Sequence, residues 1–257
     1  MWYQIIQYLK FLYLSTNQHG VHSPFVFNFI TKCFYDKTNY EDYKSISRYR
    51  KELLSNPKRI KVNDLGIGSL KIKSNERSVA DMAKYAGTSF SRAKLLFRIT
   101  HYFKPKTILE LGTSLGIASF AMHKGFPDSK ITTVEGCENL YAFTKNNFAQ
   151  NKIYNVTLIN DSFDSVINNV SKKSFDFIFF DGNHNKEGTL QYFEALLSTI
   201  HNDSVFIFDD IYLTKDMTEA WAVIKNHPKV KVTIDTYFWG LVFFRSEQKK
   251  EHFTIRV

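Results

Sequence analysis

The sequence predicts an α/β protein with a doubly wound, mostly parallel sheet of seven strands, an antiparallel C-terminal hairpin and a helical N-terminal extension. Helical patterns dominate up to about residue 104, and beyond it short apolar runs alternate with helical stretches. A chain of 257 residues suffices for one large domain with such an extension. We therefore expect a helical extension or lid over residues 1–87 and the main domain over residues 88–257.

The N-terminal region is interpreted as a series of helices. Its first stretch, "MWYQIIQYLKFLYLS", is amphipathic and lacks the basic segment and cleavage site of a signal peptide. We expect this helix to pack on its own domain or on a partner, such as a second copy in a homodimer; a position on a membrane surface is the alternative. Ser23 and Pro24 have the residue types of a helix start. Further helices are expected over residues 40–54, 76–86 and 89–103.

Composition narrows the class of protein. No apolar run approaches the roughly 20 residues that a membrane-spanning helix needs. The two cysteines, Cys33 and Cys137, do not form a disulfide framework, which favours a reducing, cytoplasmic location. The net charge is +9, and its densest basic stretch lies over residues 48–61. We favour a solvated basic surface there over a dedicated nucleic-acid face.

Five short apolar runs predict the parallel strands. Each is rich in β-branched or aromatic residues and lacks polar alternation, as strands buried on both faces do. The runs are "TILEL" (107–111), "ITTVE" (131–135), "VTLIN" (156–160), "FDFIFFD" (175–181) and "SVFIFDD" (204–210). Helical stretches separate them. The last segment, 231–245, contains two strand-like runs broken near Trp239 and Gly240, which predicts an antiparallel hairpin at the sheet edge.

Two glycine-rich stretches compete for a cofactor. In "TILELGTSLGIASF" a strand ends at Glu110, Gly112 and Gly116 allow a tight turn, and a helix follows. The next strand ends in Glu135, whose carboxylate could accept hydrogen bonds from two ribose hydroxyls. The glycine spacing does not suggest a pyrophosphate. The rival "NDLGIGS", 63–69, lacks a following helix and a second acid-ended strand, so it is interpreted as a turn or lid segment.

The segments "LELGTSLG", "TVEG", "INDSFD" and "FFDG" resemble the class I S-adenosylmethionine (SAM)-dependent methyltransferases, which have a Rossmann-like fold. Within that class the chain looks most like the catechol and caffeoyl-CoA O-methyltransferase group, in its bacterial branch with an Asp-Gly-x-His stretch. The resemblance covers roughly Thr88 to Arg245. It implies a SAM-dependent methyltransferase whose cofactor contacts are Glu110, Gly112, Thr113, Ser114, Gly116, Glu135, Gly136, Asp161, Ser162, Phe163 and Asp181.

Acids at the ends of two neighbouring strands are candidates for a metal site. Asp181, Asp209 and Asp210 could converge at one edge of the sheet, where three carboxylates would repel one another unless a cation lay between them. Mg²⁺ prefers such oxygen ligands, and Mn²⁺ or Ca²⁺ are alternatives. The catechol-type enzymes have Asp, Asp and Asn at the matching positions, so Asp210 departs from their pattern. The alternative is that these acids only cap helices and orient loops.

The reaction implied by the resemblance needs a base. His184 lies three residues beyond Asp181 and is the expected general base, with Lys186 as the second candidate. Tyr212, Trp239 and Thr88 are candidates for contact with the methyl acceptor, which we expect to be a small hydroxylated, catechol-like molecule. Two alternatives stay open: an RNA or protein methyltransferase that docks its substrate on the basic N-terminal helices, and a SAM-binding module without catalysis.

Overall fold

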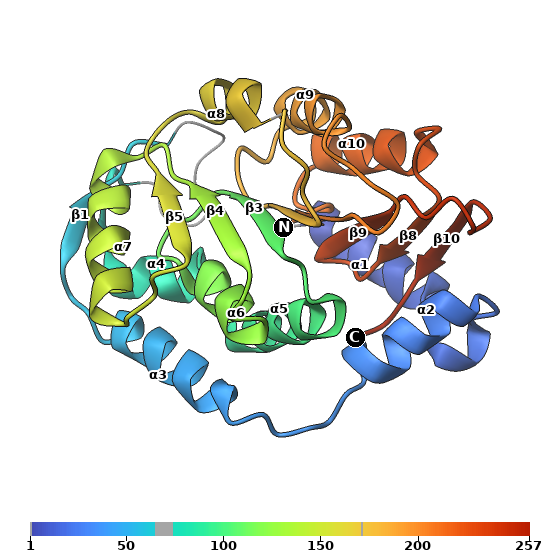
Figure 1. Ribbon diagram of the computed structural model, residues 1–257, viewed down its shortest axis with the longest axis horizontal. Helices are drawn as coiled ribbons and strands as arrows, with labels where there is room; N and C mark the ends of the chain where they lie inside the picture. Colours follow the sequence, from blue (N-terminus) through green and yellow to red (C-terminus); the bar gives the residue numbers. More distant parts are fainter. Residues whose placement is uncertain (1, 65–73, 171) are drawn as a thin grey trace.

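The computed structural model describes residues 2–64, 74–170 and 172–257. Its centre is a sheet of eight strands in the order β10-β8-β9-β7-β6-β3-β4-β5 (Figure 1). All neighbouring strands are parallel except β9, which runs antiparallel to β7 and β8. The strands are β3 (Thr107–Leu111), β4 (Lys130–Val134), β5 (Val156–Ile159), β6 (Phe177–Phe180), β7 (Val205–Asp209), β8 (Val232–Asp235), β9 (Trp239–Phe243) and β10 (Glu251–Thr254).

The prediction of a doubly wound α/β sheet is confirmed, with two corrections. The eighth strand, β10, pairs in parallel with β8 at the sheet edge. Its residues are largely polar and partly exposed, so it lacks the apolar signal of the other strands. The hairpin turn lies at residues 236–238 rather than at Trp239 and Gly240, because Trp239 already pairs with Asp209 inside the sheet.

Helices cover both faces of the sheet, because successive apolar side chains of a strand point to opposite sides. Ile108 belongs to the core cluster that contains residues of the N-terminal helices, and Leu109 to the cluster on the other face. The helices after β3 are α6 (Ile117–Gly125), α7 (Glu138–Gln150), α8 (Phe163–Val170), α9 (Lys186–Leu196) and α10 (Lys215–Asn226). Figure 1 shows α8, α9 and α10 together above the sheet, and α5 and α6 below it.

The N-terminal region is mainly helical, as predicted. It contains α1 (Trp2–Leu14), η1 (Gln18–Gly20), α2 (Pro24–Phe29), η2 (Ile30–Phe34), α3 (Asp42–Leu54), β1 (Arg59–Lys61), β2 (Glu76–Ser78), α4 (Val79–Tyr85) and α5 (Phe90–Phe103). The side chain of Ser23 caps α2, and Pro24 opens that helix. The stretch 76–86 differs from the prediction, because its first three residues form a strand paired with β1.

Helix α1 packs on the C-terminal half of the chain. The Tyr3 hydroxyl donates to Thr218 Oγ1 at 2.6 Å, and the ring of Tyr8 contacts that of Tyr237 edge-on, with 4.9 Å between centroids. The opposite face of α1 is exposed. None of the helices in the described ranges is long and apolar enough to cross a membrane.

Candidate active site

A cavity of ≈ 750 Å³ opens at the carboxyl ends of β3, β4, β6 and β7. This is where open α/β sheets bind ligands, because the loops that follow the strands diverge there. We call the part around residues 112–116 and Glu135 the loop end. The part around Asp181, His184, Asp209 and Asp210 is the acidic end. Four of the seven described non-glycine residues with positive φ line this cavity: Ser114, Asn183, His184 and Asp210.

The loop end begins with a tight turn after β3. Gly112 has φ 108°, and a Cβ at this position would collide with the backbone carbonyl of Asp181. Its N–H and that of Thr113 both donate to Val134 O, at 3.0 and 3.1 Å. Gly116, with φ 73°, is the N-cap of α6. Gly112, Thr113 and Ser114 line the cavity, whereas Gly116 faces Phe148 and does not.

Glu135 lies at the floor of the loop end. Its carboxylate accepts hydrogen bonds from the backbone N–H groups of Ser114 and Cys137, both at 2.8 Å. Burial raises the pKa of this carboxyl group, and the two backbone hydrogen bonds oppose that rise. Glu135 and Gly136 both line the cavity, so the carboxylate is fixed in place where a ligand can reach it.

Glu110 supports the loop from beneath rather than lining the cavity. It is fully buried, and one carboxylate oxygen accepts from the hydroxyls of Ser119 and Thr133. The other oxygen has no hydrogen-bond partner among the described residues. Burial raises the pKa of Glu110 to about 7, against the effect of the two hydroxyls. A direct contact between Glu110 and the cofactor would therefore need an opening that this arrangement does not show.

The segment after β5 divides into lining and supporting residues. Ser162 and Phe163 line the cavity. Asp161 does not; its carboxylate accepts from the Ser162 N–H and the Ser165 hydroxyl, both at 2.7 Å, and thereby shapes the turn into α8. Of the three residues predicted to contact adenine, Ser162 and Phe163 line the cavity.

The three aspartates converge at the acidic end, as the strand order predicts. Burial raises the pKa of Asp181 well above its usual value, and Asp209 raises it further by its charge and by a hydrogen bond between the two carboxyl groups. Arg92, from α5, lies with its Nη1 3.5 Å from Asp209 Oδ1 and 3.8 Å from Asp210 Oδ1. The described residues contain no group of three His, Cys, Asp or Glu side chains arranged to hold a metal ion.

The predicted metal site therefore does not fit the arrangement of these residues. A guanidinium has only N–H donors and a permanent positive charge, so it cannot ligate a cation and repels one. Arg92 already lies against two of the three carboxylates that were expected to be ligands. The sequence prediction missed Arg92 because it precedes the matched motifs and reaches the site only through the packing of α5.

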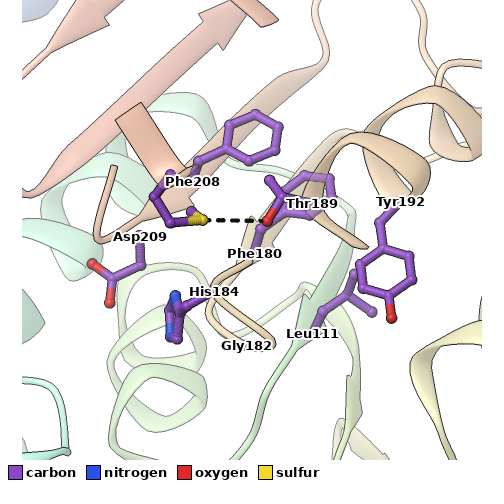
Figure 2. A pocket seen from close by; sticks show the side chains of 9 residues that line it. Leu111, Phe180, Gly182, His184, Thr189, Tyr192, Phe208 and Asp209 are labelled. Carbon is purple, nitrogen blue, oxygen red and sulfur yellow. Dashed lines mark hydrogen bonds between the residues drawn. The ribbon is translucent and has the colours of Figure 1, made fainter. Parts of the chain in front are cut away.

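The two predicted bases lie in different places. His184 lines the cavity, its Nε2 is 3.8 Å from Asp181 Oδ1, and its φ of 44° turns the loop sharply after Asn183. Figure 2 shows the His184 ring on the same side of a small pocket as the Asp209 carboxylate. Lys186, the first residue of α9, does not line the cavity. Its Nζ is 2.7 Å from Oε2 of Glu219 on α10.

Two of the three predicted acceptor contacts line the cavity. Thr88 and Trp239 do so, and the indole N–H of the buried Trp239 has no hydrogen-bond partner among the described residues. Tyr212 is not a lining residue. Its hydroxyl donates to Asp235 Oδ2 at 2.5 Å, and burial raises its pKa strongly.

The N-terminal region, which the sequence analysis interpreted as a helical extension or lid, also contributes residues to the cavity. Asn63 and Asp64 line it, and Arg77, which lies on β2, forms an ion pair with Asp64. The first two residues of the "NDLGIGS" stretch, which was interpreted as a turn or lid segment, form part of the wall. Its remaining residues lie outside the described ranges. The available signal was the acidic Asp64 three residues after the end of the short strand β1.

Comparisons with known proteins agree with this fold. Residues 109–211, which run from β3 to just beyond β7, match the family model of a methyltransferase domain. No curated protein matches the sequence.

Among solved structures, an SAH-bound methyltransferase from Podospora anserina matches with a TM-score of 0.56 and 17% identity over 82% of this chain and 98% of that one. An O-methyltransferase from Bacillus cereus in complex with SAH matches with a TM-score of 0.55 and 15% identity, over 83% of this chain and 98% of that one. The O-methyltransferase TomG from Streptomyces achromogenes, in complex with SAM, matches with a TM-score of 0.57 and 15% identity, over 81% of this chain and 92% of that one. At these identities the structures establish the fold, and the family model identifies the domain. The chain therefore contains a region similar to a methyltransferase domain, in a fold that it shares with SAM-dependent methyltransferases.

Proposed function

We propose that this methyltransferase transfers the methyl group of SAM to a hydroxyl oxygen of a small, neutral acceptor. The observation that carries the proposal is the cavity itself, which joins a loop end suited to SAM to an acidic end with an imidazole and a buried indole N–H that has no hydrogen-bond partner among the described residues. Two of the solved structures with this fold are described as O-methyltransferases. The division into an N-terminal lid, 1–87, and a catalytic domain, 88–257, is part of the proposal, as is a cytoplasmic location.

The residues of the loop end fit SAM. Glycine at position 112 permits the turn to approach the Asp181 backbone closely, because a Cβ there would collide with the Asp181 carbonyl. Glu135 offers a fixed carboxylate for the ribose hydroxyls, and Ser162 and Phe163 would contact the adenine. When bound, SAM supplies a methyl group activated by a positively charged sulfur.

His184 would accept the proton of the acceptor hydroxyl. A neutral imidazole is a suitable proton acceptor, and Asp181 Oδ1 lies 3.8 Å from its Nε2. Lys186 is tied to Glu219 outside the cavity, so we do not assign it a role in the reaction. Loss of the hydroxyl proton makes the oxygen nucleophilic enough to attack a methyl carbon.

The acceptor would lie against Thr88 and Trp239. The Trp239 indole N–H is a hydrogen-bond donor without a partner in the described residues, and a buried donor gains free energy when a ligand oxygen pairs with it. The excess of carboxylates at the acidic end disfavours anionic acceptors. The RNA alternative is weaker here, because Arg50 of the basic stretch donates to the carbonyls of Ala83 and Thr88 instead of facing outward with a free guanidinium.

The test is transfer of a labelled methyl group from SAM to a panel of catechols, simple phenols, small amines, bulk RNA and unrelated proteins. We expect labelling of hydroxylated small molecules. Labelling of RNA or protein alone would support the alternative reading, and SAM binding without transfer to any acceptor class would indicate a non-catalytic module. Lys186→Ala, at the first residue of α9, is a control variant close to His184 and should retain activity, since Lys186 pairs with Glu219 outside the cavity.

A further inference from the structure

The acidic end contains its own counter-ion. Asp181, Asp209 and Asp210 are brought together by the ends of β6 and β7, and the side chain nearest to two of them that carries a permanent charge is Arg92. No hydrogen bond from the described residues reaches the buried Oδ1 of Asp209, so the Arg92 guanidinium at 3.5 Å is its stabilising partner. A buried carboxylate without such a partner would be strongly destabilised.

Arg92 is held in this position from several sides. It lies in the first turn of α5, where its backbone N–H donates to the capping hydroxyl of Ser89 at 3.3 Å. Its guanidinium stacks over the ring of Phe238, 4.7 Å from the centroid. The carbonyl of Phe238 in turn accepts the backbone N–H of Asp210 at 2.8 Å. One loop therefore positions both the arginine and one of its acidic partners.

A divalent ion would have to break the contacts of Arg92 with Asp209 and Asp210 in order to bind these carboxylates. A cation that bound Asp209 and Asp210 would have to displace a guanidinium that also contacts an aromatic ring, and would lie close to a fixed positive charge if it did not. The side chain of Arg92 is one-third exposed and lines the cavity, so a bound acceptor could also reach the guanidinium.

We infer that Arg92 is the resident cation of the acidic end, in the place where a divalent metal would otherwise bind, and that it positions Asp209, Asp210 and the acceptor oxygen. The inference deepens the proposed function and rests on it only for the acceptor. The part of the inference that concerns the charges of Arg92 and the carboxylates does not depend on the proposed function.

The experiment is a titration of the full-length protein with Mn²⁺, followed by the electron paramagnetic resonance signal of free Mn²⁺, without SAM or acceptor. We expect no stoichiometric binding to the wild type. Arg92→Ala removes the positive charge and should bind Mn²⁺ at least tenfold more tightly, whereas Arg92→Lys keeps the charge and should resemble the wild type. The gained binding should disappear in the double variant Arg92→Ala, Asp209→Asn.

The opposite result is equally clear. One tightly bound Mn²⁺ in the wild type that is lost in Asp209→Asn would show that Arg92 moves away and would overturn the inference. The wild-type measurement decides this even if Arg92→Ala folds poorly, which its thermal unfolding would report. Because the readout is metal binding, it is independent of methyl transfer: a protein inactive on every acceptor would refute the proposed function and leave the role of Arg92 decided by the titration.

Discussion

The two ends of the cavity follow neighbouring strands of one sheet, yet different groups hold their carboxylates in place. At the loop end, backbone N–H groups of Ser114 and Cys137 hold the single carboxylate of Glu135. At the acidic end, side chains hold one another, with the Arg92 guanidinium against Asp209 and Asp210. Backbone N–H groups hold Glu135 in a fixed position, whereas the carboxyl groups at the acidic end can take up and release protons. The comparison suggests that the loop end binds and the acidic end carries out chemistry.

The largest effect expected from this division is at the acidic end. His184→Ala should reduce the rate of methyl transfer by about 10² to 10⁴ while SAM binding stays near the wild-type value, because the imidazole serves as the base and not as a cofactor contact. The loss should shrink at high pH, where the acceptor hydroxyl ionises unaided. Steady-state rates over a pH series, with SAM affinity from calorimetry, measure both. A wild-type rate in this variant would remove His184 from the mechanism.

At the loop end the expected change is in affinity. Glu135→Ala removes two charge-assisted hydrogen bonds to the ribose, each worth about 1.5–3 kcal/mol, so SAM should bind at least tenfold more weakly. Calorimetry measures this, with Glu138→Ala as the control, since Glu138 is an exposed acid in the first turn of α7.

Asp64→Ala sharpens the same comparison. Asp64 lines the wall but has its own partner in Arg77, so its loss should weaken SAM binding less than the loss of Glu135. If Asp64→Ala has the larger effect, the "NDLGIGS" wall rather than the 112–116 loop is the main cofactor contact.

A smaller effect should appear in stability beneath the loop end. The pKa of Glu110 is raised from 4.5 to about 7, chiefly by burial, so the folded protein binds this proton more tightly than the unfolded chain does. The stability that Glu110 contributes is thus fully present below pH 4.5 and is lost as the pH rises through about 7.

Urea unfolding of the wild type and of Glu110→Gln between about pH 4.5 and pH 7 measures the contribution of this proton to stability. The difference between the two free energies of unfolding should change by no more than about 1.4 kcal/mol per pH unit. The glutamine can still accept from Ser119 and Thr133, which makes it a conservative replacement. Parallel stability profiles of the two proteins would show that Glu110 stays ionised in the folded state.

Much of the sheet could be predicted because its strands are continuous apolar runs, and the convergence of Asp181 with Asp209 follows from the order of those strands. Contacts that depend on distant segments could not be predicted in this way. Arg92 reaches the acidic end through the packing of α5, and Arg77 meets Asp64 through the pairing of β1 with β2. The strand β10 was missed because polar, partly exposed residues carry no periodic apolar signal.

The division between the two ends is tested most directly by a crystal structure of the protein with S-adenosylhomocysteine. We predict that both ribose hydroxyls lie within hydrogen-bond distance of the Glu135 carboxylate, that the adenine contacts Phe163, and that the sulfur faces the acidic end with Arg92 still against Asp209. A ligand whose ribose contacts Asp209 or Asp210 instead of Glu135 would contradict the assignment of both ends.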